Sequence, residues 1–563
     1  MTTLFTNRFY IGFIGKSLMA FACAFSLMLT TAKAQITTVF YILLENRNFT
    51  ENETSGGQQI VGSSAAPYIN SLITPGNPNA AQVSYCSCYH EVLSTYNGNN
   101  PSIHPSEPNY VWMENGSNLS KLDDNDPYGS GHSVEQISDY LGANPNLTGE
   151  NLSGLLQAAG VSWKSYSEDT QMLNSNGLNF NTAGGTMTSN AAPSSQWTVP
   201  LVSFSGTSTS YTNPYNGTHQ FNFACKHTGQ LFFPATNGST VTTADTSPQN
   251  VDAYHYPPLQ QLASDLANNT VAAYNVITPD QYNDMHTALS TNFVYNGVTY
   301  THGSDSEQVA QGDNFLSIVI PEIMNSPVYQ AGHAAIFIWT DETEGANQND
   351  FNHTLTEIVI SPYCKGNAYD SELNYTHSSD IATMQEIFGV TATTPTGYLN
   401  DAANFSNSSN GQVGTSQIAG TAPFGTAFTQ SVSPTGGFGT GVAQDMSDLF
   451  VPGTIPALPG LSLSASGYAY NRHTGTYSQT VTITNTLSTA ITNPIYLVLG
   501  NLSSNATLVD SAGTTVNTYP GSPYVSVSST GLAAGASATV SLQYTATGTI
   551  SSIMTPINTA AQP

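Results

Sequence analysis

Three largely apolar runs lie in the first 435 residues of the chain, at 38–44, 334–340 and 355–360. Each run has the length of a strand and is followed by polar residues. Largely apolar runs of this length are typical of strands that are covered on both faces. The runs therefore predict a sheet that is buried between two layers.

Two stretches between the runs have the pattern of helices. Residues 151–159 precede Gly160, a residue that favours the left-handed conformation found at helix ends. Residues 314–325 carry apolar side chains at helical spacing. Strands that alternate with helices predict an α/β fold, with a mostly parallel sheet and helices on both faces. Such folds bind ligands at the carboxyl ends of their strands.

The pattern changes near residue 461. Apolar and polar residues alternate, as in strands with one buried face, at 477–484, 524–527 and 538–544. This alternation predicts a C-terminal all-β sandwich of the Ig-like kind over residues 461–563. The Gly- and Pro-rich residues 436–460 are expected to form a linker, which leaves 35–435 as the α/β domain.

The first 34 residues have the features of a signal peptide. Basic residues precede an apolar run at 17–29, and Ala32-Lys33-Ala34 matches a cleavage motif. We therefore expect a secreted, periplasmic or cell-surface protein with no transmembrane segment after signal removal. The alternative is an uncleaved anchor, although the run is shorter than the roughly 20 residues that span a bilayer.

Four cysteines follow the signal segment: Cys86, Cys88, Cys225 and Cys364. An even number in an oxidising compartment predicts two disulfides, with the pairing left open. A zinc site at Cys86 and Cys88 is the alternative, but no second Cys or His pair follows at the spacing of a zinc finger.

The formal net charge is −27, with only nine Lys and Arg residues. A nucleic-acid partner is therefore not expected, because the phosphate backbone would be repelled. Charged residues make up 8% of the chain, so the surface is expected to consist mainly of Asn, Thr, Ser and Gln. A small anionic substrate stays compatible with this charge if a bound metal reverses the local field.

Carboxylates follow two of the predicted strands. Glu45-Asn46 comes after the run at 38–44, and Asp341-Glu342 after the run at 334–340. Carboxylates that meet at one edge of a sheet repel each other unless a cation neutralises them. Oxygen ligands suit a hard divalent ion, and a nearby imidazole would favour zinc or manganese.

A serine with candidate chemistry is Ser106, which precedes Pro108 at a predicted helix start. Alone, Ser106 could be a helix N-cap, and Glu45-Asn46 an ordinary exposed strand end. Asp341 could likewise be an N-cap residue. Only the conjunction of these features indicates a site.

Seven blocks of the sequence resemble, in order, the phosphoesterase family of bacterial phospholipases C and acid phosphatases, within the alkaline-phosphatase-like superfamily. The resemblance covers about residues 36–392. The blocks are LLENRNF (43–49), HPSEPNY (104–110), AGVSWKSY (159–166), KH (226–227), ITPDQYNDMH (277–286), WTDE (339–342) and YTHS (375–378). Two departures stand out: Thr340 separates the tryptophan from the acidic pair, and Thr228-Gly229 follow the KH block.

This resemblance implies an alkaline-phosphatase-like sheet and a site for a divalent metal ion, whether Zn, Ca, Mg or Mn. It implies that Ser106 is the nucleophile. The other implied roles are metal ligands at Glu45, Asn46, Asp341 and Glu342, catalytic histidines at His286, His353 and His377, and substrate contacts at His104, Asn109, His227 and Asp284. Asp280 and Asp284 are candidates for a second metal or for orienting groups.

The resemblance leads us to expect a metal-dependent phosphoric ester hydrolase, an acid phosphatase that acts on phosphomonoesters through a phosphoserine. The form of the 104–110 block and the block around Trp163 resemble the acid phosphatase branch. One alternative is a phosphodiesterase of the phospholipase C type, with a phospholipid substrate. Another is a non-catalytic surface protein that binds through its C-terminal sandwich.

Overall fold

The computed structural model describes most of the chain after residue 35. The described residues are 36–50, 59–90, 105–116, 123–129, 148–344, 354–373, 375–393, 445–451, 461–485, 494–500, 502–515 and 522–548, with single residues and short pieces between and after them.

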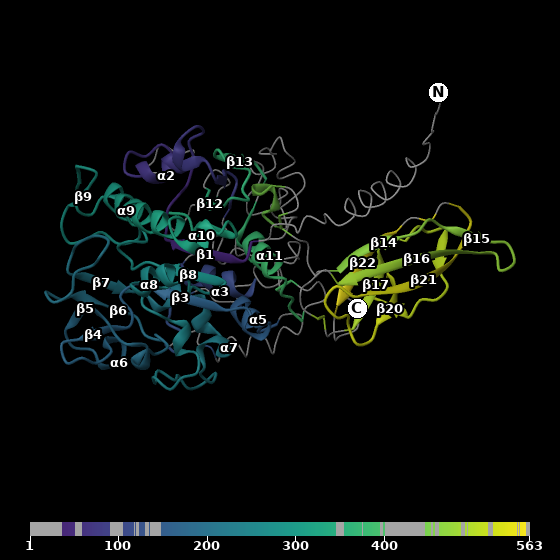
Figure 1. Cartoon of the computed structure of the whole chain (residues 1–563), viewed down its shortest axis with the longest axis horizontal. Coiled ribbons are helices and arrows are strands. Elements are labelled where there is room, and N and C mark those ends of the chain that lie inside the picture. The colour runs from purple at the N-terminus through teal and green to yellow at the C-terminus, as the bar shows by residue number, and fades with distance from the viewer. Residues whose placement is uncertain are drawn as a thin grey trace, which may run out of the picture. The chain divides into compact units, whose positions relative to one another are not determined.

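A seven-stranded sheet forms the centre of the α/β region (Figure 1). Six of its strands run in the same direction and one, β12, runs against them. The strand order is β13 (Tyr369–Ser371), β2 (Val83–Cys86), β12 (Glu357–Ile360), β11 (Ala334–Thr340), β1 (Thr38–Leu44), β8 (Tyr274–Thr278) and β3 (Trp163–Ser167). The predicted α/β class is confirmed.

Strand β1 shows why the apolar runs become central strands. All seven of its residues are buried. Because successive side chains point to opposite faces, Tyr41 and Leu43 enter one core while Phe40 and Ile42 enter the other. A strand with water on one face would carry polar side chains at every second position, and β1 carries none in its centre.

Helices cover both faces of the sheet. Residues of α3 (Glu107–Asn115), α5 (Leu152–Ala158) and α11 (His377–Phe388) share the core with Tyr41 and Leu43. On the other face lie α2 (Pro67–Leu72), α8 (Gln261–Asn268), α9 (Asp305–Met324) and α10 (Pro327–Gln330). The two predicted layers are therefore present.

The direction of β12 differs from that of an all-parallel sheet. Its register with β11 is antiparallel, with Trp339 opposite Glu357. A parallel neighbour needs a crossover connection, usually a helix, whereas an antiparallel neighbour does not. The apolar run at 355–360 predicted a buried strand correctly, but a run that is apolar on both faces carries no information about direction.

The predicted helices are present with shifted boundaries. Helix α5 ends at Ala158, and Gly160 has a φ of +73°, as expected of a residue just past a helix end. Helix α9 begins nine residues before the predicted start at 314. Its N-cap Ser304 accepts a hydrogen bond from the Glu307 amide, so a polar first turn extends the helix beyond its apolar pattern.

Shorter strands and helices lie in the connections between the main elements. The strands form three two-stranded ribbons: β4 (Met172–Asn174) with β5 (Met187–Ala191), β6 (Phe204–Thr207) with β7 (Gln220–Phe223), and β9 (Phe293–Tyr295) with β10 (Val298–Tyr300). The short helices are α6 (Phe180–Ala183), α7 (Pro234–Asn237) and the 3-10 turns η1 (Pro78–Ala80), η2 (Ser194–Gln196), η3 (Cys225–His227), η4 (Gly229–Phe232), η5 (Ala253–His255) and η6 (Ser447–Leu449).

The C-terminal region forms two antiparallel sheets around a shared apolar core, as the alternating pattern predicts. One sheet contains β14 (Leu461–Ala465), β16 (Thr476–Asn485), β21 (Ser537–Ala546) and β18 (Ala506–Leu508), with β15 (Ala469–Asn471) paired to β16. The other contains β19 (Gly513–Thr514), β20 (Pro523–Ser528), β17 (Ile495–Gly500) and β22 (Ile553–Asn558). Along β16, Val481 and Ile483 are buried, whereas the alternating Thr480 is exposed and Thr482 is half-buried.

The predicted disulfides are absent. All four cysteines of the described part carry free thiols: Cys86, Cys88, Cys225 and Cys364. Burial raises the pKa of each thiol, so each is a neutral apolar group in its surroundings. Counting cysteines assumed that a secreted chain oxidises them, whereas here Cys86, Cys225 and Cys364 are buried as small hydrophobic side chains and Cys88 is half-buried against the core.

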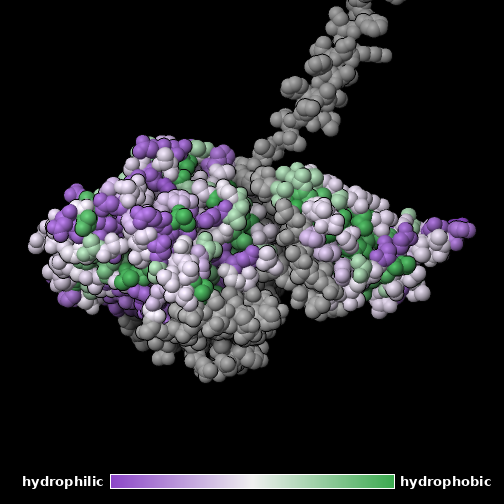
Figure 2. Space-filling view, turned by 90° about the horizontal axis from the view of Figure 1, so that it is seen from below, coloured by the Kyte–Doolittle hydropathy of each residue, from purple (hydrophilic) through white to green (hydrophobic). Residues whose placement is uncertain are grey.

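The face of the molecule seen in Figure 2 is mixed in hydropathy. Figure 2 shows mostly pale colours of intermediate hydropathy, with hydrophobic residues in separate small groups on the face in view. Within the described residues, no helix combines the length and the apolarity that crossing a membrane requires.

Gly229 provides a test of the packing that holds α3 in place. A Cβ added at residue 229 would lie 2.2 Å from the carbonyl oxygen of Tyr110 in α3. We expect Gly229→Ala to lower the free energy of unfolding by about 1–3 kcal/mol, because backbone must move to relieve the overlap. Chemical denaturation measures this change. Gly467→Ala is the control, since nothing lies within 4 Å of a Cβ there, and equal stability losses in both variants would contradict the prediction.

Candidate active site

The ends of β1 and β11 bring two acidic residues together. Leu44 and Thr340 are register partners at the carboxyl ends of these parallel neighbours. The next residues are Glu45 and Asp341, and the Asp341 amide donates to the Leu44 carbonyl over 3.3 Å. The backbone pairing therefore fixes where the two carboxylates lie.

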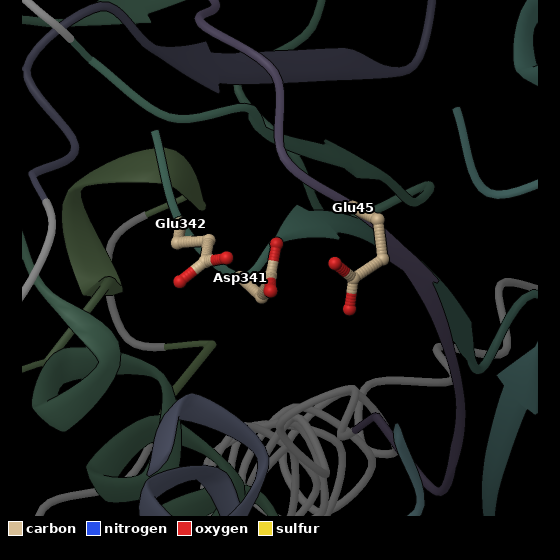
Figure 3. Close-up of side chains that lie close together, drawn as sticks. All are labelled: Glu45, Asp341 and Glu342. Atoms are coloured by element: carbon tan, nitrogen blue, oxygen red, sulfur yellow. The ribbon is translucent and has the colours of Figure 1, made fainter. Parts of the chain in front are cut away.

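Glu45, Asp341 and Glu342 form a buried acidic group, which we call the strand-end acid cluster. Each offers a carboxylate oxygen within 4.8 Å of the others. In Figure 3 Asp341 lies between Glu45 and Glu342. None of the three is more than 2% exposed, and Asp341 Oδ2 has no hydrogen-bond partner.

Burial dominates the electrostatics of the strand-end acid cluster. It raises the pKa of Glu45 well above its ordinary value, and the charge of Asp341 raises it further. The pKa of Asp341 is raised by burial and then by the charge of Glu342. The pKa of Glu342 is raised by burial and then by the charge of Glu45. A cation among these carboxylates would remove both effects.

Asn46 completes the oxygen-rich set. Its side-chain amide donates to Glu342 Oε1 over 2.8 Å, and its backbone amide donates to Asp341 Oδ1 over 2.9 Å. Its φ is +50°, in the left-handed region that asparagine tolerates better than most residues. This backbone turn lets one residue contact both partners.

Ser106 lies directly against the cluster. Its Oγ is 2.8 Å from Glu45 Oε2 and 3.0 Å from Glu342 Oε1. Ser106 is the N-cap residue of α3, and Pro108 stands in the first turn of that helix. The serine hydroxyl is only slightly exposed, at 4%. The sequence thus placed Ser106 correctly at a helix start.

Tyr110 also contacts the cluster, and sequence reasoning did not assign it a role. Its hydroxyl donates to Glu45 Oε1 over 2.6 Å. Residues four apart in a helix share a face, so Ser106 at the start of α3 places Tyr110 on the same side. That spacing could have found it.

His227 and Asp284 lie on the other side of Glu45. His227 Nε2 is 3.2 Å from Glu45 Oε1, and its ring stacks on Tyr110 with centroids 4.8 Å apart. Burial lowers the pKa of His227 well below its ordinary value, so the imidazole is neutral. Asp284 Oδ2 lies 3.8 Å from His227 Nδ1. The Asp284 carbonyl also accepts a hydrogen bond from the Glu45 amide.

His377 is held by protein groups through both ring nitrogens. Nε2 lies 2.7 Å from the Asp341 carbonyl and 3.2 Å from Asn109 Oδ1. Nδ1 lies 2.8 Å from the Tyr89 hydroxyl, which in turn donates to Asp380. His377 therefore supports the backbone of a cluster residue in this arrangement.

His286 lies beside Asp284, whose Oδ1 accepts the His286 amide over 2.8 Å. Its Nδ1 lies 3.0 Å from the Thr287 hydroxyl. Burial, followed by the charges of Lys226 and Arg47, lowers the pKa of His286 to about 4. Two other predicted residues, His104 and His353, fall outside the described residues.

A second acidic group follows the next two strands of the sheet. Glu168 follows β3 and Asp280 lies just after β8, and with Asp169 they bring carboxylate oxygens within 4.8 Å of one another. Asn213 and Asn283 donate to Glu168 Oε1 over 2.6 and 2.8 Å. Asp280 therefore belongs with Glu168 and Asp169, and not in a pair with Asp284.

The strand-end acid cluster fits a divalent cation. Three carboxylates and the Asn46 amide supply hard oxygen ligands, and Asp341 Oδ2 is buried without a partner. Glu45, Asn46, Asp341 and Glu342 are the residues that could hold the ion. Ser106 Oγ, at hydrogen-bond distance from two of them, lies where a ligand or nucleophile would contact it.

A family model described as "Phosphoesterase family" matches residues 100–391, a little more than half of the chain. The chain belongs to the Phosphoesterase family. The match includes Ser106, Asp341 and Glu342, so this phosphoesterase is a hydrolase that acts on phosphoesters. No curated protein sequence matches the chain.

Solved structures of the alkaline phosphatase superfamily and of sulfatases are distant neighbours of this phosphoesterase. A protein in the Alkaline Phosphatase Superfamily from Vibrio parahaemolyticus is 10% identical, with a TM-score of 0.34 over 63% of this chain and 67% of that chain. The lipoteichoic acid synthase LtaP from Listeria monocytogenes is 10% identical, with a TM-score of 0.33 over 65% and 74%. The PsFucS1 sulfatase from Pseudoalteromonas sp. is 9% identical, with a TM-score of 0.35 over 91% and 86%. We draw no functional inference from likenesses this remote.

Loading the cluster with a divalent ion should release protons. The raised pKa values mean that the ion-free cluster holds protons that an ion must displace, so affinity for the ion should rise as pH rises. Near neutral pH we expect the release of about one proton per ion. Calorimetric titration of the chelator-treated protein with Mn²⁺ or Zn²⁺, in two buffers of different ionisation enthalpy, measures this number. Binding with no proton release would contradict the assignment.

Proposed function

We propose that this phosphoesterase is a metal-dependent phosphatase that hydrolyses phosphomonoesters through a phosphoserine formed on Ser106. One observation carries the proposal: Ser106 Oγ lies 2.8 Å and 3.0 Å from two carboxylates of a buried acidic cluster that fits a cation. A serine used only as a helix cap would bond its own helix, and Ser106 makes no such side-chain bond.

Activation of the hydroxyl is the first chemical requirement. A divalent ion held by Glu45, Asn46, Asp341 and Glu342 would supply positive charge that favours the serine alkoxide and balances the phosphoryl oxygens. Glu45 Oε2 is placed to accept the Ser106 proton. Tyr110 donates to the other oxygen of Glu45 and so keeps that carboxylate oriented.

The position of Ser106 at the N-terminus of α3 favours attack on phosphorus. The amides of the first turn and the helix dipole stabilise negative charge near the helix start. In the proposed first step the Ser106 oxygen forms a bond to phosphorus while the bond to the substrate alkoxide breaks. Water then attacks the phosphoserine, which returns the serine and yields inorganic phosphate.

The departing alkoxide needs a proton. His227 and His286 are the described imidazoles on the Glu45–Asp284 side, and burial lowers the pKa of both. The negative charge of a bound phosphate would favour the protonated form of a neighbouring imidazole, which could then donate to the leaving oxygen. We assign the general acid to this pair and the support of Asp341 to His377.

We also propose that the chain is exported and that the sandwich at 461–563 is a separate domain. The support is the signal-like first 34 residues and the distinct antiparallel sheets of the C-terminal region.

Replacing the nucleophile tests the proposed function. We expect Ser106→Ala to lower turnover of p-nitrophenyl phosphate by roughly 10⁴–10⁶-fold, since alanine has no side-chain oxygen to form the covalent intermediate. The measurement is kcat on purified protein of verified thermal stability. Ser195→Ala, an exposed serine in η2, is the matched control and should keep full turnover. Wild-type kcat in Ser106→Ala would remove Ser106 as the nucleophile.

The two ester classes can be compared directly on the wild-type protein. We expect kcat/KM for p-nitrophenyl phosphate to exceed that for bis-p-nitrophenyl phosphate by about 10²-fold or more, because one charged oxygen of the monoester is blocked in the diester. A preference for the diester, together with release of phosphocholine from phosphatidylcholine vesicles, would replace the phosphatase by the phospholipase C alternative.

A further inference from the structure

A pocket of about 470 Å³ lies beside the active site, between the β6–β7 hairpin, residues 124–126 and Lys226. We call it the Lys226 pocket. Its volume is within the range of small-molecule sites, roughly 300–1,000 Å³. Every lining residue belongs to the described part of the chain.

Two chain connections join the Lys226 pocket to the nucleophile. Asn125, on its wall, donates its backbone amide to Glu107, the residue that follows Ser106. Lys226 precedes His227, whose ring contacts Glu45. The charge of Lys226 also acts on the pKa of Glu45, and that of Asp124 on the pKa of Glu342. A substrate with its phosphate at Ser106 would therefore extend its alcohol portion toward this pocket.

The lining is rich in groups that bind hydroxyls. Ser205, Asn222 and Gln281 are neutral hydrogen-bonding residues of the wall, and Asn222 already donates to Gln281 Oε1 over 3.1 Å. The rings of Phe204 and Phe223 supply the apolar part of the lining. This mixture suits a molecule that has C–H faces and several hydroxyl groups.

The charged residues that line the Lys226 pocket disfavour the binding of an anionic group in addition to the phosphate. Lys226 is its only cation among the described lining residues, and its ammonium group is paired with Asp124. Asp126 adds a further carboxylate, which accepts from the Ser203 amide and hydroxyl. An alcohol portion that carries its own carboxylate would meet these acids without a free cation to balance it.

We propose that the Lys226 pocket receives the alcohol portion of the substrate and selects small, uncharged, polyhydroxylated alcohols over acyl chains and over acidic alcohols. The assignment rests on the proposed phosphatase function and names its substrate class: phosphomonoesters of polyols and sugars. The pocket is too polar for the acyl chains of a lipid, because its half-buried and exposed polar groups would lose their water partners against hydrocarbon.

The first experiment compares two substrates of the same skeleton. Glycerol 3-phosphate and 3-phosphoglycerate differ by a hydroxymethyl against a carboxylate. We expect wild-type kcat/KM to favour glycerol 3-phosphate by about tenfold or more, as for a like-charge contact. Asp124→Asn should reduce this ratio, since it removes one of the repelling charges. An unchanged ratio in Asp124→Asn, or a wild-type preference for 3-phosphoglycerate, would overturn the charge selection.

The second experiment fills the pocket. Ser205→Phe should lower kcat/KM for glycerol 3-phosphate by about tenfold while leaving that for methyl phosphate unchanged, because its alcohol portion is a single methyl group too small to fill the pocket. Thr207→Phe is the control: it lies on the same side of β6 two residues away, is also exposed, and does not line the pocket. The proposal would be overturned if both variants lost kcat/KM equally. It would also be overturned if Ser205→Phe lowered kcat/KM equally for the two substrates.

The outcomes separate this inference from the function on which it rests. If the wild-type protein hydrolyses methyl phosphate and glycerol 3-phosphate equally well, the phosphatase stands and the pocket assignment fails. If it hydrolyses dioctanoyl phosphatidate better than glycerol 3-phosphate, the pocket assignment also fails, with a lipid as the substrate class. If it hydrolyses no phosphomonoester at all, the proposed function fails, and the pocket assignment fails with it.

Discussion

The structure depends on the burial of acidic side chains at the point where neighbouring parallel strands end. Removing these carboxylates from water costs free energy. Leu44 and Thr340 are paired in register, so the residues after them must lie close together. The carboxylates of Glu45 and Asp341 are therefore buried next to each other, which is unfavourable for two charged groups. The surrounding groups are all donors to these carboxylates: the Asn46 amides, the Tyr110 hydroxyl and the Ser106 hydroxyl. A cation fits this arrangement because it stabilises all the carboxylates at once.

The same constraint appears twice in the sheet. Glu168 follows β3 and Asp280 lies two residues after β8, just as Glu45 follows β1 and Asp341 follows β11. The two groups are treated differently by their surroundings. Asparagine side chains and backbone amides bind the carboxylates of Glu168 and Asp280. Asp341 Oδ2, in contrast, is buried with no partner. The Ser106 hydroxyl lies beside the cluster that contains Asp341, which is why we place the chemistry there.

The hydrophobic pattern was sufficient to predict the central strands, because a strand buried on both faces needs apolar residues at every position. The bounds of β1 and β11 follow from the sequence residue by residue. The direction of β12 and the first turns of α9 could not be predicted this way, since they depend on a connection and on a polar cap. The free state of the cysteines could not be predicted, because the number of cysteines in a sequence is the same whether their thiols are buried and free or oxidised to disulfides.

The candidate site was predicted in part. Motif order identified Ser106, Glu45 and Asp341, but it could not show that the His377 ring has both nitrogens committed to protein groups. It also could not show that Tyr110 reaches Glu45, since that contact depends on the angle at which α3 meets the sheet. Contacts made across 60 residues or more are decided by packing, and a local motif does not contain them.

Asn46 shows how narrowly such a site limits further change. Its backbone must adopt a left-handed turn, while its amide nitrogens serve Asp341 and Glu342 at the same time. Glycine would satisfy the turn and lose the side chain; glutamine would keep an amide but resist the turn. Aspartate would accept the turn and add a fourth negative charge. Each of these replacements would therefore lose the turn, the two contacts or the charge balance that Asn46 provides beside the cluster.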